Sequence, residues 1–171
     1  KADLFDFGDA PDSPAGNFPS LLSSNGARHM EFPFLLGDQA GGESDSNQID
    51  EDDFNVGEDD GGVLYATGPI GAVTYGVKLK IHNKSWPEDK DIVLNIFYEK
   101  NDDLSWETNE HIVVDKIFHL KPGDSAFYSV PNINTAGKLN WLRAMLTDVE
   151  IGPANLGTGE YAYGETEDYF L

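Results

Sequence analysis

The chain has 171 residues, enough for one domain with a sizeable hydrophobic core, and its apolar content is that of a globular protein. Eleven Lys and Arg residues stand against 31 Asp and Glu, a formal net charge of -20, so the surface repels nucleic acid and anionic membranes and favours cations. The absence of cysteine excludes disulfides, thiolate metal ligands and cysteine nucleophiles. No apolar run approaches membrane-spanning length, so we expect no direct membrane insertion, and the oligomeric state stays open.

The first 62 residues are acidic, and their pattern predicts a long irregular segment. They open with "LFDFGDAPDS" (4–13), where an aspartate recurs every third residue among Gly and Pro, which disfavour a helix. At most one short helix is expected, near residues 18–29. The recurring aspartates either cap turns or hold an ion, and they are Asp6, Asp9 and Asp12.

No Lys or Arg occurs between Arg28 and Lys78, and this gap contains an acidic block at 42–62. Such a block is typical of a solvated, disordered segment. Apolar residues interrupt it and paired glycines flank it, which also suits a loop folded around ions. Both interpretations stay open, and the candidate ligands in the block are Asp50, Asp52, Asp53, Asp59 and Asp60.

From residue 63 onward, short runs rich in β-branched and aromatic residues alternate with turn signals such as "KPGD" and "GPANLGTG". This spacing predicts an all-β fold, an antiparallel β-sandwich of the jelly-roll or Greek-key type. We expect residues 63–171 to form the sandwich and residues 1–62 to wrap on it as part of one structural unit. The predicted strands are 72–83, 91–100, 111–120, 125–131, 138–149 and 160–171.

Oxygen ligands dominate the options for a metal site, because the four histidines lie in unrelated segments without the spacing of a zinc site. Ca²⁺ suits irregular, Asp-rich backbone better than Mg²⁺, which demands stricter geometry. The loop "EKNDDLSWETNE" (99–110) is one candidate calcium loop, with Asn101, Asp102 and Asp103 as ligands, although it lacks the EF-hand pattern. A polar hairpin tip is the alternative for this loop.

The sequence contains no nucleophile elbow, phosphate-binding loop or dinucleotide fingerprint, so we expect no enzymatic activity. Its aromatic residues raise sugar binding as another function. Trp86 and Trp106 lie in turn-like segments, where an exposed ring can stack on a sugar, whereas Trp141 lies in a predicted strand and is expected in the core.

Both ends of the chain resemble the GEVED domain family. The C-terminal "GETEDYFL" (164–171) is similar to the closing Gly-Glu-Val-Glu-Asp motif, with Thr166 in place of the valine, and "LRAMLT" (142–147) resembles the strand before it. "KPGDSAFYSVP" (121–131) is similar to the family's "PGxxxxxFxVP" strand. Upstream, "DFGDAPDS" and "GARH" (26–29) resemble the segment that often precedes such domains, so the likeness covers nearly the whole chain in order.

The resemblance implies a β-sandwich module of large secreted or cell-surface microbial proteins. The loop at 99–110 departs from the family's aspartate-dense pattern, with Lys100 and Leu104 intruding, which weakens any calcium site there. We therefore expect an extracellular, calcium-stabilised accessory or adhesion module without catalytic activity, with a surface glycan or a protein as its partner. The alternative is a carbohydrate-binding module attached to a polysaccharide-active enzyme.

Carboxylates from the two ends of the chain can share an ion only after folding has brought them together, which would couple metal binding to folding. Arg143 is the expected buried counter-charge, since a guanidinium can pair two carboxylates at once. The expected ligands are Asp6, Asp9 and Asp12, acids of the 50–60 block, and the C-terminal Glu165, Glu167 and Asp168.

Overall fold

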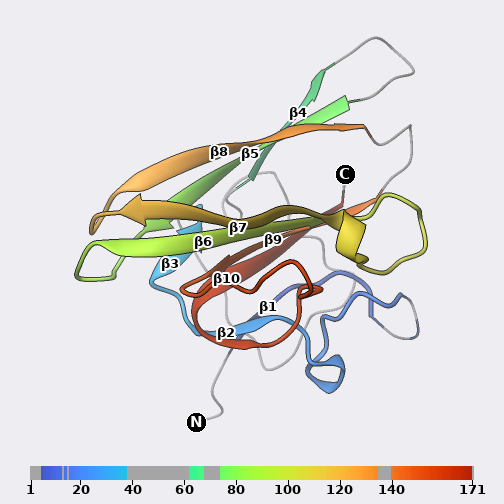
Figure 1. Cartoon of the computed structure of the whole chain (residues 1–171), viewed down its shortest axis with the longest axis horizontal. Helices are drawn as coiled ribbons and strands as arrows, with labels where there is room; N and C mark the ends of the chain where they lie inside the picture. The colour runs from blue at the N-terminus through green and yellow to red at the C-terminus, as the bar shows by residue number, and fades with distance from the viewer. Residues whose placement is uncertain are drawn as a thin grey trace.

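The computed structural model describes residues 5–12, 14, 16–37, 62–67, 74–134 and 140–170. These residues form an all-β fold of ten strands arranged in two sheets (Figure 1). The helical segments among them are single 3₁₀ turns, and none has the length and apolarity that crossing a membrane requires.

The larger sheet has six strands, and the last strand of the chain, β10, lies inside it. Neighbouring strands in this sheet are antiparallel, as expected, except for β2 and β10. These two strands are parallel, with Arg28 opposite Glu160 and Glu31 opposite Tyr163. In sheet order the strands are β1 (Asp6–Phe7), β2 (Arg28–Glu31), β10 (Glu160–Phe170), β9 (Trp141–Thr147), β6 (Lys90–Tyr98) and β7 (His111–Leu120).

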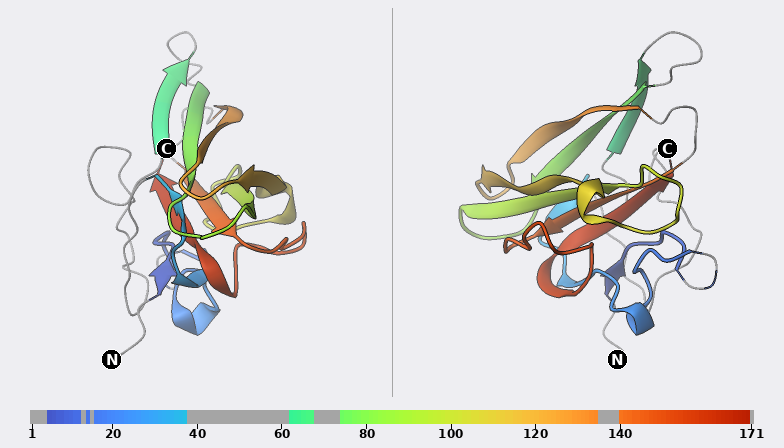
Figure 2. Two further views of the ribbon diagram at one scale, coloured as in Figure 1. Left: turned by 90° about the vertical axis from the view of Figure 1, so that its left-hand side faces the viewer. Right: turned by 45° about the vertical axis from the view of Figure 1, so that its right-hand side comes forward.

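The smaller sheet is built around β5. Strand β8 pairs along one edge of β5, and β3 and β4 follow one another along its other edge, with Leu36 opposite Ile81 and Gly62 opposite Leu79. Figure 2 shows β4, β5 and β8 rising away from the larger sheet. The strands are β3 (Phe34–Leu36), β4 (Gly62–Thr67), β5 (Thr74–Asn83) and β8 (Ser125–Asn134).

The six strands predicted from local pattern are confirmed as β5 to β10, with ends that shift by a few residues. The described residues up to position 37 are less irregular than expected, because β1 pairs with β2, β2 pairs with β10 and β3 pairs with β5. The expected helix near 18–29 is only a 3₁₀ turn at Leu22–Ser24, which Asn25 ends in a left-handed conformation. The acidic block at 42–61 lies outside the described residues.

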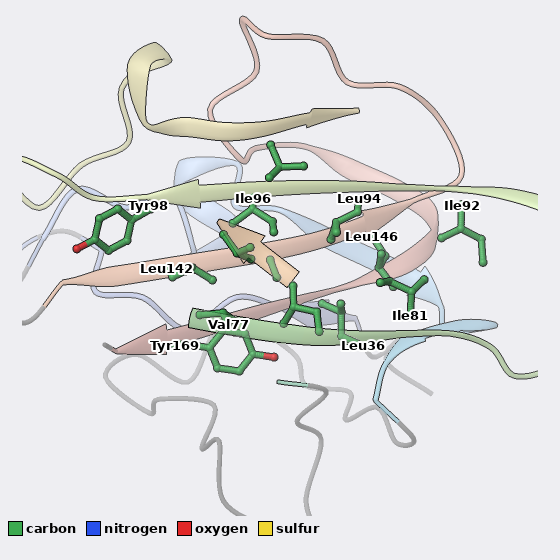
Figure 3. Packing of buried hydrophobic residues seen from close by; sticks show 14 of the residues in the cluster. Leu36, Val77, Ile81, Ile92, Leu94, Ile96, Tyr98, Leu142, Leu146 and Tyr169 are labelled. Carbon is green, nitrogen blue, oxygen red and sulfur yellow. The ribbon is translucent and has the colours of Figure 1, made fainter. Parts of the chain in front are cut away.

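The two sheets share one hydrophobic core. Val77, Leu79 and Ile81 alternate along β5 and are fully buried, and they belong to the same cluster as the buried aliphatic residues of β6 and β9. Figure 3 shows side chains from both sheets meeting in this cluster, with Leu36 and Tyr169 among them. Every second residue in this part of β5 is apolar, and these residues form the face that the sheet buries.

A second apolar cluster covers the opposite face of the larger sheet. Phe97 of β6 and Trp141 of β9 pack there with Phe18 and Ala10 of the N-terminal segment and with Trp106. All seven residues of β9 are buried for this reason. A strand that is covered on both faces loses its clean alternation, which explains why "WLRAMLT" reads as a nearly continuous apolar run.

Gly164 is a position where the fold requires glycine. Its φ is +139°, and a Cβ there would lie 1.9 Å from the Leu146 carbonyl oxygen.

We expect Gly164→Ala to lower the free energy of unfolding by about 3 kcal/mol or more, because strain and a backbone clash add together. Gly123→Ala is the matched control, since Gly123 also has a positive φ but nothing within 4 Å of its Cβ, and it should cost about 1 kcal/mol. Equal losses in urea unfolding would contradict this account.

Candidate metal centre and the contacts around it

Two glutamates of β10 point toward the apolar core. Glu165 lies opposite Leu146 of β9 and Glu167 lies opposite Ala144, and both β9 residues belong to the core cluster. Directly opposed residues share a face of the sheet, so the two glutamates share the face of the core. Glu165 is 0% exposed and Glu167 is 2% exposed.

Asp6 of β1 completes a cluster of three buried carboxylates. The Thr166 amide donates to Asp6 Oδ2 at 2.6 Å, and the Leu36 amide donates to Glu165 Oε2, so β1, β3 and β10 all position the cluster. One oxygen from each of Asp6, Glu165 and Glu167 lies within 4.8 Å of the other two. We call these three residues the carboxylate triad.

The charge of the triad is not offset by its neighbouring imidazole. His29 Nδ1 lies 3.5 Å from Asp6 Oδ2, but complete burial lowers the pKa of His29 to about 3, so the ring is neutral at physiological pH. Three ionised carboxylates this close repel one another strongly in an interior of low dielectric. Protons or a cation can relieve that repulsion, and a donor set made only of carboxylate oxygens suits a hard divalent cation.

Arg143 of β9 lies fully buried opposite Asp168 of β10, and the two form a bidentate ion pair. Nε donates to Asp168 Oδ1 at 2.8 Å and Nη2 donates to Asp168 Oδ2 at 2.7 Å. The remaining donors reach the Pro19 carbonyl at 2.7 Å, the Ser20 hydroxyl at 2.7 Å and the Gly157 carbonyl at 2.9 Å. All five N–H groups of the guanidinium therefore have an acceptor.

Asp168 was a predicted metal ligand, and its carboxylate forms this ion pair. Its Oδ2 also accepts the Ala10 amide at 2.7 Å, so both oxygens are engaged. The ion pair explains why the "DFGDAPDS" motif has a glycine at position 8. A Cβ on Gly8 would lie 2.4 Å from Asp168 Oδ2 and 2.7 Å from Arg143 Nη2. The backbone of the N-terminal segment therefore packs directly against the ion pair, with no room for a side chain at Gly8.

The other two aspartates of the motif do not join the triad. Asp12 is 4% exposed, and its Oδ2 accepts the Ser20 and Leu21 amides at 3.0 Å each and the Ser24 hydroxyl. This is the turn-capping role that the sequence left open for the aspartates. Asp9 is half-buried and lies outside the triad.

The acids predicted in the loop at 99–110 also stay apart from the triad. Asn101, Asp102 and Asp103 are exposed, and Asp103 accepts the amide and hydroxyl of Ser105 at 3.0 and 2.8 Å. This arrangement fits the polar hairpin tip. The predicted ligands of the 50–60 block, Asp50, Asp52, Asp53, Asp59 and Asp60, lie outside the described residues.

Two glutamates that were not among the predicted ligands of this loop accept hydrogen bonds from its backbone. Glu99 accepts the Leu104 amide at 2.8 Å, and Glu110 accepts the amides of Lys100 and Glu107 at 2.5 and 3.0 Å. Burial raises the pKa of both carboxyls. The signal for Glu110 was present, since Glu107 stands three residues before it in a capping box.

The two tryptophans predicted to bind a sugar both pack against other aromatic side chains. Trp106 is 4% exposed in the second cluster, so its predicted exposure is wrong. Trp86 is half-buried against Phe34 and Tyr163, with Lys90 Nζ 5.0 Å from its ring centroid. Trp141 is buried in the second apolar cluster, in agreement with the expectation that its side chain is packed inside the protein.

Comparison with known proteins found no match to this chain among family models, curated proteins or solved structures.

The buried ion pair allows a direct stability test. Arg143→Met leaves Asp168 charged and unpaired in the interior, and we expect the free energy of unfolding to fall by about 3–5 kcal/mol. Arg28→Met is the control, because Arg28 pairs with the exposed Glu160 and its loss should cost at most about 1 kcal/mol. Urea denaturation measures both variants. A loss for Arg143→Met as small as that of the control would show that the pair does not hold the fold.

His111 provides a pH prediction. Its ring stacks on Phe97 and contacts Asn95, and burial lowers its pKa below 6.5. The native state therefore binds fewer protons than the unfolded state, and stability falls as the pH drops below about 6.5, by at most about 1.4 kcal/mol per pH unit for one group. We expect His111→Gln to lose less stability than the wild type between pH 7 and pH 5. An unchanged slope in His111→Gln would contradict the assignment.

Proposed function

We propose that this chain is an extracellular, calcium-stabilised β-sandwich of the GEVED type that serves as a non-catalytic accessory or adhesion module of a larger secreted or cell-surface protein. The observation that carries the proposal is the carboxylate triad, in which Asp6 near one end of the chain meets Glu165 and Glu167 near the other. A cation there joins the two ends of the chain, so binding and folding are coupled.

The arrangement of the family-like motifs supports this proposal. The "DFGDAPDS" segment contacts the "GETEDYFL" strand through Asp6 and Ala10, and Arg143 of "LRAMLT" pairs with Asp168 of the same strand. His29 of "GARH" lies beside Asp6. Motifs that are far apart in the sequence therefore meet at β10, with the triad on one face of this strand and the ion pair on the other.

Calcium is the cation we propose, because its flexible coordination accepts six to eight oxygens, and three carboxylates can supply several of them. The amides of Thr166 and Leu36 fix the orientation of two of these carboxylates. Mg²⁺ requires a more regular octahedron and keeps several waters, which is harder to accommodate beside an apolar core.

Thermal unfolding with Ca²⁺ and then with a chelator tests the proposal. An ion present at a hundred times its Kd stabilises the native state by about 2.7 kcal/mol, which should raise the Tm by several degrees. Mg²⁺ at equal ionic strength controls for charge screening. The proposal is wrong if the Tm does not move and native mass spectrometry detects no bound ion.

A matched pair of variants locates the site. Glu167→Gln removes one charge from the triad and should abolish most of the Tm shift caused by Ca²⁺, because the ion loses a carboxylate ligand. Asp103→Asn removes one charge from the exposed loop tip and should leave the shift intact. Equal effects of the two variants would place the ion elsewhere.

A further inference from the structure

In the part of the chain that the structure describes, each sheet ends in a ten-residue strand that is paired on one side only. Strand β7 pairs with β6 in the larger sheet, and β8 pairs with β5 in the smaller one (Figure 1). An open edge presents backbone N–H and C=O groups to which another strand can pair, unless a bulge or a charge prevents it. The two edges differ in this protection.

Strand β7 is protected against further pairing. Its register with β6 shifts in the middle of the strand, where Asp115 has a left-handed φ of +48°. The Asp115 carboxylate accepts the amides of Ile151 and Gly152 at 2.9 Å each, and the charged Lys116 comes next in the chain. A bulge that binds a neighbouring loop, followed by a charge, makes this edge a poor template for another strand.

Strand β8 has neither a bulge nor a charge between Ser125 and Val130, where it pairs with β5 in a continuous register. Phe127 lies at the middle of this stretch and is 60% exposed, the largest value among the exposed large apolar side chains of the described residues. The Lys78 ammonium of β5 lies 4.4 Å from the centroid of its ring. This edge is therefore regular, uncharged and apolar at its centre.

The hydrogen bonds of β5 show which backbone groups of β8 face the open edge. The Gly37 amide donates to the Lys80 carbonyl at 2.9 Å, so the backbone of Lys80 faces β3. Successive residues of a strand point their N–H and C=O groups to opposite sides, so the backbone of Leu79 faces β8 and its partner there, Tyr128. The residues on either side of these β8 positions turn their backbone groups outward, and they are Ser125, Phe127 and Ser129.

We propose that the β8 edge pairs antiparallel with the β8 edge of a second copy of this chain, which joins the two smaller sheets across a twofold axis. A twofold interface must be complementary to itself. The outward-facing residues read Ser, Phe, Ser in both directions, so an antiparallel copy places Phe127 opposite Phe127 and Ser125 opposite Ser129. Aromatic residues directly opposite each other stabilise an antiparallel pair. This inference does not depend on the carboxylate triad.

The register of this pairing is fixed at both ends of the outward-facing row. Pro131 has no amide hydrogen and lies where the register between β8 and β5 shifts, so the regular edge ends after Ser129. The strand begins at Ser125. A shift of two residues in either direction would lose a pair of outward-facing residues and separate the two Phe127 rings.

The charge distribution favours association at this edge over the rest of the chain. Two chains of net charge -20 repel each other, but charges more than about 8 Å apart are largely screened at physiological salt. Strand β8 carries no acid, and the nearest cation, Lys78, lies on β5. The β5 strands of the two copies would be three strand spacings apart, about 14 Å, so their lysines would repel each other weakly.

Sedimentation equilibrium of the full chain, from about 1 μM to about 1 mM, tests the inference in the range where a small interface dissociates. The wild type should approach twice its monomer mass of 18.8 kDa, and added salt should lower the dimer Kd by screening the repulsion. Phe127→Lys places two like charges opposite each other and should raise the Kd at least about tenfold. Ile117→Lys, at an exposed position of β7, should leave the Kd within about twofold.

A wild type that stays monomeric throughout this range, or a Kd that Phe127→Lys does not raise, overturns the inference. In the first case the edge is left to a strand of a different protein.

A single cysteine locates the interface, because the chain has no cysteine of its own. In Phe127→Cys the proposed pairing places the two cysteines opposite each other with their Cα atoms about 5.5 Å apart, which a disulfide accepts. Mild oxidation should convert this variant to a covalent dimer, whereas Ile117→Cys should remain mostly monomeric. Equal cross-linking of the two variants, or none in Phe127→Cys although the wild type dimerises, would place the interface elsewhere and overturn the inference.

Discussion

The hydrogen bonds and the ion pair of the buried Arg143 guanidinium are the interactions on which the rest of this structure depends. It is completely buried, and a buried cation is tolerated only when its charge and all its N–H donors are matched. Here the matching groups come from three regions of the chain: Asp168 in the last strand, Pro19 and Ser20 in the N-terminal segment, and Gly157 in the preceding loop. Satisfying one side chain therefore fixes the relative positions of both ends of the chain.

The buried acidic residues described in this chain differ in the groups that surround their carboxylates. These differences separate structural residues from candidate functional ones. Asp168 has a guanidinium partner, and Asp12 and Glu110 accept backbone amides. The triad differs because three carboxylates lie together beside a neutral imidazole. Proximity of carboxylates in an apolar interior, rather than the number of acids in the chain, is what makes it the candidate cation site.

Prediction from sequence succeeded where structure follows from local pattern. The alternation in β5 and the dense β-branched runs of β6 and β7 marked strands because each run has its own buried face. Strands β1 and β2 have two and four residues, and β3 follows a proline, so their pattern is too short to detect and their pairing comes from distant strands. Trp106 was misplaced for a related reason, since the N-terminal segment that buries it lies about ninety residues away.

The sequence by itself determined the all-β class, the main strands and the strong excess of acid. These properties depend on composition and on neighbours along the chain. Only the tertiary structure decided which carboxylates meet, because Glu167 and Asp168 are adjacent in sequence but point to opposite faces of β10. Glu167 therefore belongs to the triad, and Asp168 pairs with Arg143. The local sequence does not indicate which part of the chain packs on each face of β10.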